Sequence, residues 1–171
     1  MKILQTNIKI IDGDRGKNYP TPNELLTSGY CLFLNNKNIV NNKLSLIDSN
    51  YISEQKHNKL SKGSLNRKDL VSTTRGSLGN LLYIDSKFPL PARINSGMVI
   101  IQSDESEYRQ NYLYYYFQSK NFKDQIAELR TGSAQPQLPI KDFQHIDLLE
   151  HSLFEQQHIV NSINCEVKYA C

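Results

Sequence analysis

The chain has 171 residues, of which 39% are hydrophobic and 22% charged, a composition typical of a globular protein long enough to bury a core. Its formal net charge of +3 permits a polyanionic partner without demanding one. Apolar runs stay short of the about 18 residues that a membrane-spanning helix needs, and the first residues lack the apolar core of a signal peptide. The three cysteines have neither metal-ligand nor redox spacing, which agrees with a reducing, cytoplasmic compartment.

The first hundred residues predict short strands and turns. Residues 30–34 (YCLFL) are β-prone and lie between a glycine and two asparagines, as strands do. Residues 69–73 and 80–84 predict a second pair of strands joined by a turn. Residues 97–101 (GMVII) form a continuous apolar run that is too short for a typical helix, which predicts a buried strand. The asparagine-rich segment 35–42 predicts a polar hairpin loop.

The hydrophobic period changes after residue 106. Leu113, Tyr116 and Phe117 are spaced three and four apart, as on one face of a helix. A second helix is expected to begin after Ser119, a residue type that caps helices, and to end near Gly132. Its apolar face consists of Phe122, Ile126 and Leu129.

The tail begins with Ser152 and Glu155 in the spacing of a capping box, which predicts a C-terminal amphipathic helix. Apolar residues then follow the seam positions of a coiled coil, with the polar Gln156 in one slot. The seam consists of Leu153, Val160, Ile163 and Val167. A self-sufficient coiled coil takes about three or four heptads, more than this tail offers. Two interpretations stay open: an oligomer or partner helix, and an ordinary amphipathic helix docked on its own domain.

Catalytic motifs are weak. Residues 76–79 (GSLG) lack the lysine of a phosphate-binding loop, and the histidines form no His-Glu-x-x-His pair. Glu54 and Lys56 have the Glu-x-Lys form found in many nucleases, with Asp48 as a conceivable second carboxylate. Chance readily produces such a triplet in a chain that contains many lysines and glutamates. A nuclease is therefore a weaker hypothesis for this chain than a nucleic-acid-binding protein.

Loops carry the polar and cationic side chains that suggest a function. Residues 12–17 (DGDRGK) hold two carboxylates, too few for an oxygen-ligated cation site, and favour a turn that presents Arg15 and Lys17. Residues 74–76 (TRG) form a cationic turn, and residues 135–137 (QPQ) an amide-rich loop after a helix. Arginine and glutamine pair with the edges of guanine and adenine. In an arbitrary protein, the arginine of residues 74–76 could simply be a solvated side chain in a hairpin turn, and residues 135–137 could simply be a surface loop that connects a helix to a strand.

An ordered series of short motifs runs over most of the chain, from about residue 11 to residue 160. Each motif alone is weak, but their order is specific. The motifs are IDGDRGKNYP at 11–20, KDLV at 68–71, TTRG at 73–76, INSG at 94–97, YLYYYF at 112–117, GSAQPQL at 132–138 and EQQHIV at 155–160. In this series the chain resembles a target recognition domain of a type I restriction-modification specificity subunit.

The resemblance implies an α/β (α+β) fold, in which a recognition domain with a mixed, curved β-sheet and packed helices occupies residues 1–150. Residues 151–171 then form a C-terminal amphipathic helix, the start of the spacer and dimerisation helix. Such a subunit reads double-stranded DNA for a prokaryotic, cytoplasmic complex with methyltransferase (modification) and restriction subunits. The subunit itself is expected to be non-catalytic and to hold no metal or cofactor, because S-adenosylmethionine, ATP and magnesium belong to the partner subunits.

The resemblance and the loop chemistry together nominate DNA-binding residues. The candidates for base readout are Gln135 and Gln137, with Arg75 and Arg93 also expected to approach DNA. The candidates for phosphate contacts, which position a protein without reading sequence, are Thr74, Asn95 and Ser133. The expected electrostatic fringe consists of Arg15, Lys17, Arg67 and Lys68.

The sequence departs from the full family pattern. It has room for one recognition domain instead of two, and residues 148–154 (LLEHSLF) replace the proline-rich stretch before the long helix, which is itself short. A natural half-subunit, a truncated gene product and an expressed fragment all fit. A homodimer through the C-terminal seam would read a symmetric split site. A truncated interaction protein would instead dock on restriction-modification partners without reading DNA.

Overall fold

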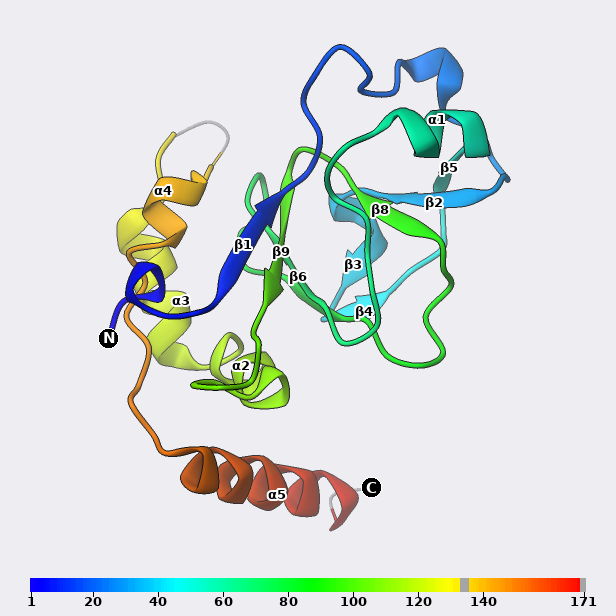
Figure 1. The fold of residues 1–171 in the computed structure, drawn as a ribbon. Helices are drawn as coiled ribbons and strands as arrows, with labels where there is room; N and C mark the ends of the chain where they lie inside the picture. Colours follow the sequence, from blue (N-terminus) through cyan, green and yellow to red (C-terminus); the bar gives the residue numbers. More distant parts are fainter. Residues whose placement is uncertain (133–135, 170–171) are drawn as a thin grey trace.

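The computed structural model describes residues 1–132 and 136–169, with side chains as far as residue 165. Strands in these residues form a four-stranded sheet, a three-stranded sheet and a two-stranded ribbon. Figure 1 shows the four-stranded sheet in the middle, with α3 (Lys120–Leu129) and α4 (Ile140–Phe143) on one side and the three-stranded sheet on the other. None of the described helices is long and apolar enough to cross a membrane.

The four-stranded sheet has the order β1-β9-β6-β7, with antiparallel neighbours throughout. Its strands are β1 (Lys9–Asp12), β6 (Leu70–Thr73), β7 (Leu81–Tyr83) and β9 (Met98–Gln102). The strand pair predicted at 69–73 and 80–84 and the buried strand predicted at 97–101 are confirmed.

The central sheet separates two apolar cores, because successive side chains of a strand point to opposite faces. In β9, Val99 packs among the helices, whereas Met98 and Ile100 pack against the second sheet. On the helix side, the rings of Phe117 and Phe122 meet edge to face, with centroids 4.7 Å apart. Replacing a fully buried ring such as Phe122 by alanine would cost about 3–5 kcal/mol. The sheet is therefore fixed on both faces, and its ends are available for loops.

The three-stranded sheet has the order β5-β2-β8. β2 (Cys31–Leu34) confirms the strand predicted at 30–34, and it runs antiparallel to β5 (Asn50–Ile52) and parallel to β8 (Ala92–Ile94). The sheet is mixed, and the α+β fold expected from the resemblance is confirmed.

The asparagine-rich segment after β2 folds into a short turn and a hairpin. It contains η3 (Asn36–Asn38), β3 (Ile39–Val40) and β4 (Lys43–Leu44). Asn41 and Asn42 have φ angles of 51° and 58°, and two positive φ angles are the signature of a tight type I′ hairpin turn, which asparagine tolerates. The predicted hairpin is thereby confirmed.

The longer helices were also predicted from the sequence. α2 (Gln110–Tyr116) and α3 cover the helix-side core. The Ser119 hydroxyl accepts a hydrogen bond from the backbone N–H of Phe122 at 3.2 Å, which confirms the predicted cap of α3. Glu155 and Ser152 form the predicted capping box at the start of α5 (Leu153–Tyr169), with Ser152 N–H donating to the Glu155 carboxylate at 2.7 Å.

Several short helices were not predicted. They are η1 (Ile3–Gln5), η2 (Pro22–Glu24), α1 (Glu54–Lys59) and α4. α1 begins after Ser53, whose hydroxyl accepts the N–H of Lys56 at 3.2 Å. Its six residues complete fewer than two turns, so the sequence offers no helical period to detect.

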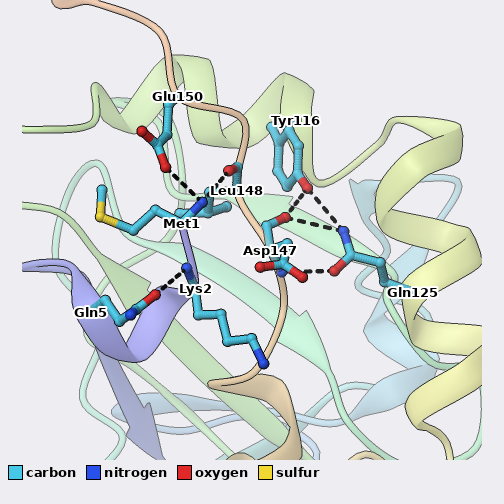
Figure 2. A network of polar contacts seen from close by, with 8 residues as sticks. All are labelled: Met1, Lys2, Gln5, Tyr116, Gln125, Asp147, Leu148 and Glu150. Atoms are coloured by element: carbon cyan, nitrogen blue, oxygen red, sulfur yellow. Dashed lines mark hydrogen bonds and ion pairs between the residues drawn. The ribbon is translucent and has the colours of Figure 1, made fainter.

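The segment that leads into α5 is held between the N-terminal residues and the helices α2 and α3 (Figure 2). Leu148 N–H donates to the Met1 carbonyl at 2.7 Å. Asp147 N–H donates to the Gln125 side-chain oxygen at 2.7 Å, and the Asp147 carbonyl accepts from the Gln125 amide at 3.1 Å and from the Tyr116 hydroxyl. These bonds fix the direction in which the chain approaches α5.

α5 docks on its own domain through a buried polar side chain. Gln156 is fully buried; its amide oxygen accepts the Arg109 N–H, and its nitrogen donates to the Glu107 and His151 carbonyls, each at 2.8 Å. Val160 is only 2% exposed and belongs to the helix-side core. Of the two interpretations left open for this helix, the burial of Val160 favours docking on its own domain.

The other seam positions are less enclosed. Leu153 and Ile163 are half-buried, and the Leu153 carbonyl accepts a hydrogen bond from Arg109 Nε at 3.2 Å. Val167 lies outside the residues whose side chains are described. The contacts support the docked amphipathic helix over the coiled-coil seam, and the domain boundary at residue 150 stays a prediction.

Candidate nucleic-acid interface

Several strands end at one edge of the fold, and the loops that carry Arg15, Arg75 and Gln137 emerge there. β1 and β6 end where β9 begins, because the registers place Thr73 beside Met98 and the end of β1 beside the start of β9. β2 and β8 are parallel and end together, with Leu34 beside Ile94. The turn at 95–97 then connects β8 to β9 and joins the two sheet ends. We call this surface the convergent edge; it consists of residues 13–16, 35–37, 74–79, 95–97 and 136–137.

The Arg75 turn is anchored through its backbone. Thr74 N–H donates to the Gly97 carbonyl at 2.8 Å, and the Asn36 side-chain amide donates to the Arg75 carbonyl. The Arg75 side chain is half-exposed and leaves this fixed backbone, as base readout requires. Thr74 is only 4% exposed, so the expected donation from its hydroxyl to a phosphate does not agree with its burial.

The amide-rich loop lies against the Arg75 turn. Gly76 N–H donates to the Pro136 carbonyl at 2.9 Å. Gln137 is exposed, and its backbone exchanges two hydrogen bonds with Thr131, each at 2.8 Å. The two loops singled out in the sequence are therefore neighbours, with Gln137 on the surface. Ser133 and Gln135 lie outside the described residues.

The loop after β1 reaches the same edge. Arg15 forms an ion pair with Asp12 at 2.9 Å and donates to the Ser96 carbonyl at 3.1 Å. The Asn95 side-chain oxygen accepts a backbone N–H two residues further on at 2.9 Å, so part of this amide shapes its own turn. A Cβ on Gly13 would lie 2.2 Å from the Asn95 carbonyl oxygen, which explains the glycine in this close approach.

Asp14 joins the loop to the segment after α1. Its carboxylate accepts the N–H of Gly16 at 3.0 Å, and the N–H and hydroxyl of Ser61 at 2.8 and 3.0 Å. These bonds, led by that from Gly16, lower the pKa of Asp14. Lys17 follows as an exposed side chain. Within the described residues, no group of three or more His, Cys, Asp and Glu side chains could hold a metal ion.

Arg93 does not lie on the surface. It is 6% exposed, and its guanidinium donates to the carbonyls of Lys62 at 2.6 Å and of His57 and Leu60 at 3.0 Å. Nε also donates to His57 Nδ1 at 3.1 Å. Burial lowers the pKa of Arg93. The expectation that Arg93 approaches DNA is corrected: its donors close the C-terminal end of α1, where helical carbonyls need partners.

Arg67 and Lys68 precede β6, whereas Arg75 follows it. The four residues of β6 lie between them, about 13 Å at 3.3 Å per residue. Arg67 and Lys68 line a hollow with Lys9 and Gln102, which pair at the far ends of β1 and β9. Arg67 Nη1 donates to the carbonyls of Asp85 and Phe88, each at 2.6 Å. The structure thus places these two members of the expected fringe away from the convergent edge, on which Arg15 lies.

The nuclease interpretation finds no support in the contacts of Lys56. Its ammonium pairs with Glu24 at 2.7 Å and donates to the Asn18 carbonyl at 3.2 Å. The hydrogen bond from Lys56 lowers the pKa of Glu24 to about 2. Lys56 thus holds α1 against the preceding loop, while Glu54 is an exposed residue of its first turn.

An amide-lined groove at this edge was not predicted from the sequence. The groove has a volume of about 430 Å³. Its lining residues are Asn35, Asn36, Lys37, Asp48, Asn50 and Asn95. Asn36 is the tie to Arg75 described above, and its side-chain oxygen is buried without a hydrogen-bond partner among the described residues. The asparagine-rich composition of 35–42 was the available signal, and it was interpreted only as a hairpin.

Solved structures resemble this fold closely. A chain from a structure concerned with the complex assembly and conformational transition of the type I R-M system matches with a TM-score of 0.73 and 15% identity, over 99% of this chain and 38% of its own. The HsdS subunit from Thermoanaerobacter tengcongensis matches with a TM-score of 0.68 and 17% identity, over 99% of this chain and 37% of its own. The S subunit of a type I restriction-modification system from M. genitalium matches with a TM-score of 0.59 and 16% identity, over 96% of this chain and 37% of its own.

The chain therefore spans less than two fifths of the length of these structures. Among curated proteins, no match is found. A family model for the type I restriction modification DNA specificity domain matches residues 8–163, which is most of the chain. The chain belongs to the family of type I restriction-modification DNA specificity domains.

Proposed function

We propose that this chain reads the sequence of double-stranded DNA as the specificity subunit, or one half of it, in a type I restriction-modification complex. The observation that carries the proposal is the convergent edge, where Arg15, Arg75 and Gln137 lie on loops tied to one another. Arginine and amide side chains on rigid loops are the groups that distinguish base edges in the major groove. Family membership supports the same role.

Within this proposal the residues divide by exposure. Arg75 and Gln137 are the candidates for base readout, because their side chains leave anchored backbones and reach the surface. Arg15, Lys17 and Lys37 supply positive charge that orients DNA without reading it. If Arg75 pairs with guanine, Arg75→Ala should weaken binding by about 1–3 kcal/mol and relax the preference at one base.

We also propose that methylation and cleavage belong to partner subunits, together with S-adenosylmethionine, ATP and magnesium. A target base must leave the stack before its atoms can be methylated, and this domain would supply the register and grip for that step. The start of α5 offers a candidate docking surface, because Phe154 is 82% exposed and Leu149 49% exposed. Such a complex would work in the prokaryotic cytoplasm.

The test is selection of bound sequences from a randomised duplex pool, followed by sequencing, over a series of salt concentrations. An enriched short motif that persists as salt rises would support sequence reading, because non-specific binding falls steeply with salt. Binding that lacks any motif would contradict sequence reading by the isolated chain. A chain that binds no DNA but captures the methyltransferase subunit through α5 would favour the interaction protein instead.

A further inference from the structure

A second groove adjoins the Arg75 turn on the side of α3. It has a volume of about 630 Å³. One wall is α3, and the opposite wall consists of the β3–β4 hairpin and the turn at 76–80. Gly79 lets that turn sit directly on the helix, since a Cβ there would lie 2.7 Å from the Ile126 side chain. The groove continues from the convergent edge, because Gly76 and Pro136 belong to both.

The helical wall of this groove is cationic. Lys123 and Arg130 line it, with the small Ala127 between them, while Ile126 on the neighbouring face is buried in the core. Among the described residues, the lining contains no carboxylate, and neither cation has an ion-pair partner. The acidic Asp124 of α3 pairs at 2.5 Å with Lys120 instead. The wall therefore presents two uncompensated positive charges toward the groove.

Both charges lie on one side of α3. Lys123 and Arg130 are seven residues apart, which is close to two helical turns, or about 10.5 Å along a helix that rises 1.5 Å per residue. Double-stranded DNA carries one negative charge per about 1.7 Å of its axis, so cations in this groove would meet closely spaced phosphates. Arg130 and Lys123 are both exposed, so their flexible side chains can follow the strand.

We infer that this groove is a phosphodiester track: Lys123 and Arg130 bind the DNA strand that flanks the bases offered to the Arg75 turn. The inference rests on the proposed function and extends it to a surface that the sequence motifs did not indicate. Since phosphate contacts carry no base information, the track should contribute affinity and register, with specificity left to the convergent edge.

The experiment compares two double variants with the unaltered chain. Lys123→Gln with Arg130→Gln removes the two groove charges, whereas Lys120→Gln with Lys141→Gln removes two exposed charges outside the groove and is matched in net charge. Thermal unfolding establishes that both fold. Dissociation constants over a salt series and the selected motif are then measured for all three.

The track predicts that the slope of log affinity against log salt falls by about 1.8 in the groove variant, at about 0.9 per lost phosphate contact. The motif should stay unchanged, and the control should keep the original slope. Equal slopes in the two variants, or an altered motif in the groove variant, would overturn the track. The unaltered chain could select no motif while the groove variant still loses salt-dependent binding; that result would refute sequence reading and support the track. If the unaltered chain binds no DNA even at low salt, both proposals are refuted.

Discussion

Replacing Arg93 separates a structural role from a DNA-reading one. The change Arg93→Ala removes a guanidinium that donates to the carbonyls of His57, Leu60 and Lys62 from a site only 6% exposed. A hydrogen bond from a charged donor contributes about 1.5–3 kcal/mol, and an acceptor left without a partner costs more when buried. Some of the freed carbonyls regain water, so we expect the free energy of unfolding to fall by about 3–5 kcal/mol.

Urea unfolding measures this loss, with Arg75→Ala as the control. Arg75 is half-exposed, and its replacement should change the free energy of unfolding by less than about 0.5 kcal/mol. Arg93→Lys should recover only part of the stability, because an ammonium cannot reproduce the planar fork that reaches several carbonyls. An Arg93→Ala protein with unchanged stability and lost DNA binding would refute the structural role and restore the expectation drawn from the sequence.

Three further predictions concern other parts of the molecule. Burial and, second, the charge of the nearby Arg93 lower the pKa of His57 below 6.5. As the pH drops, the unfolded chain therefore takes up a proton before the folded chain does, and the free energy of unfolding should fall below about pH 6.5. Urea unfolding at several pH values should show this fall, and a less steep one in His57→Asn. Gly13→Ala should destabilise the protein by more than about 1 kcal/mol and weaken DNA binding, since its Cβ would lie 2.2 Å from a backbone oxygen; unchanged melting and affinity would contradict the close approach. Gln156→Ala should cost about 2–3 kcal/mol by leaving three backbone groups without partners, and hydrogen exchange should show α5 opening before the sheet; simultaneous opening would show that the helix is held otherwise.

Much of the fold followed from local signals. The strands around Arg75 and the strand before Gln102 were predicted, because short β-branched runs between turn residues have a clear physical meaning. The caps at Ser119 and Ser152 were predicted for the same reason: one side chain satisfies a nearby N–H. Among the elements that position the loops, β1, β8, α1 and α4 were not individually predicted, because three or four strand residues or fewer than two helical turns display no clear period.

The site was harder to predict, because burial depends on partners that are distant in sequence. The sequence shows Arg93 only as a cation near a loop. Its burial follows from the fold, which brings β8 beside the carbonyls at the end of α1. Val160 lies on the apolar face that its spacing predicted, but the spacing does not say whether a second chain or its own domain covers that face. Asn36 reaches Arg75 across 39 positions, a contact for which the hairpin signal gives no hint.

Two of the ties that hold the Arg75 turn at the convergent edge run through the main chain. Thr74 N–H bonds to the Gly97 carbonyl, and Gly76 N–H to the Pro136 carbonyl. Every residue has the carbonyl, and every residue except proline has the N–H. The side chains of Arg75 and Gln137 can consequently be exchanged without removing these two bonds. If the proposed DNA-reading role holds, a few substitutions of exposed side chains at this edge would change the sequence that is bound while the backbone stays the same.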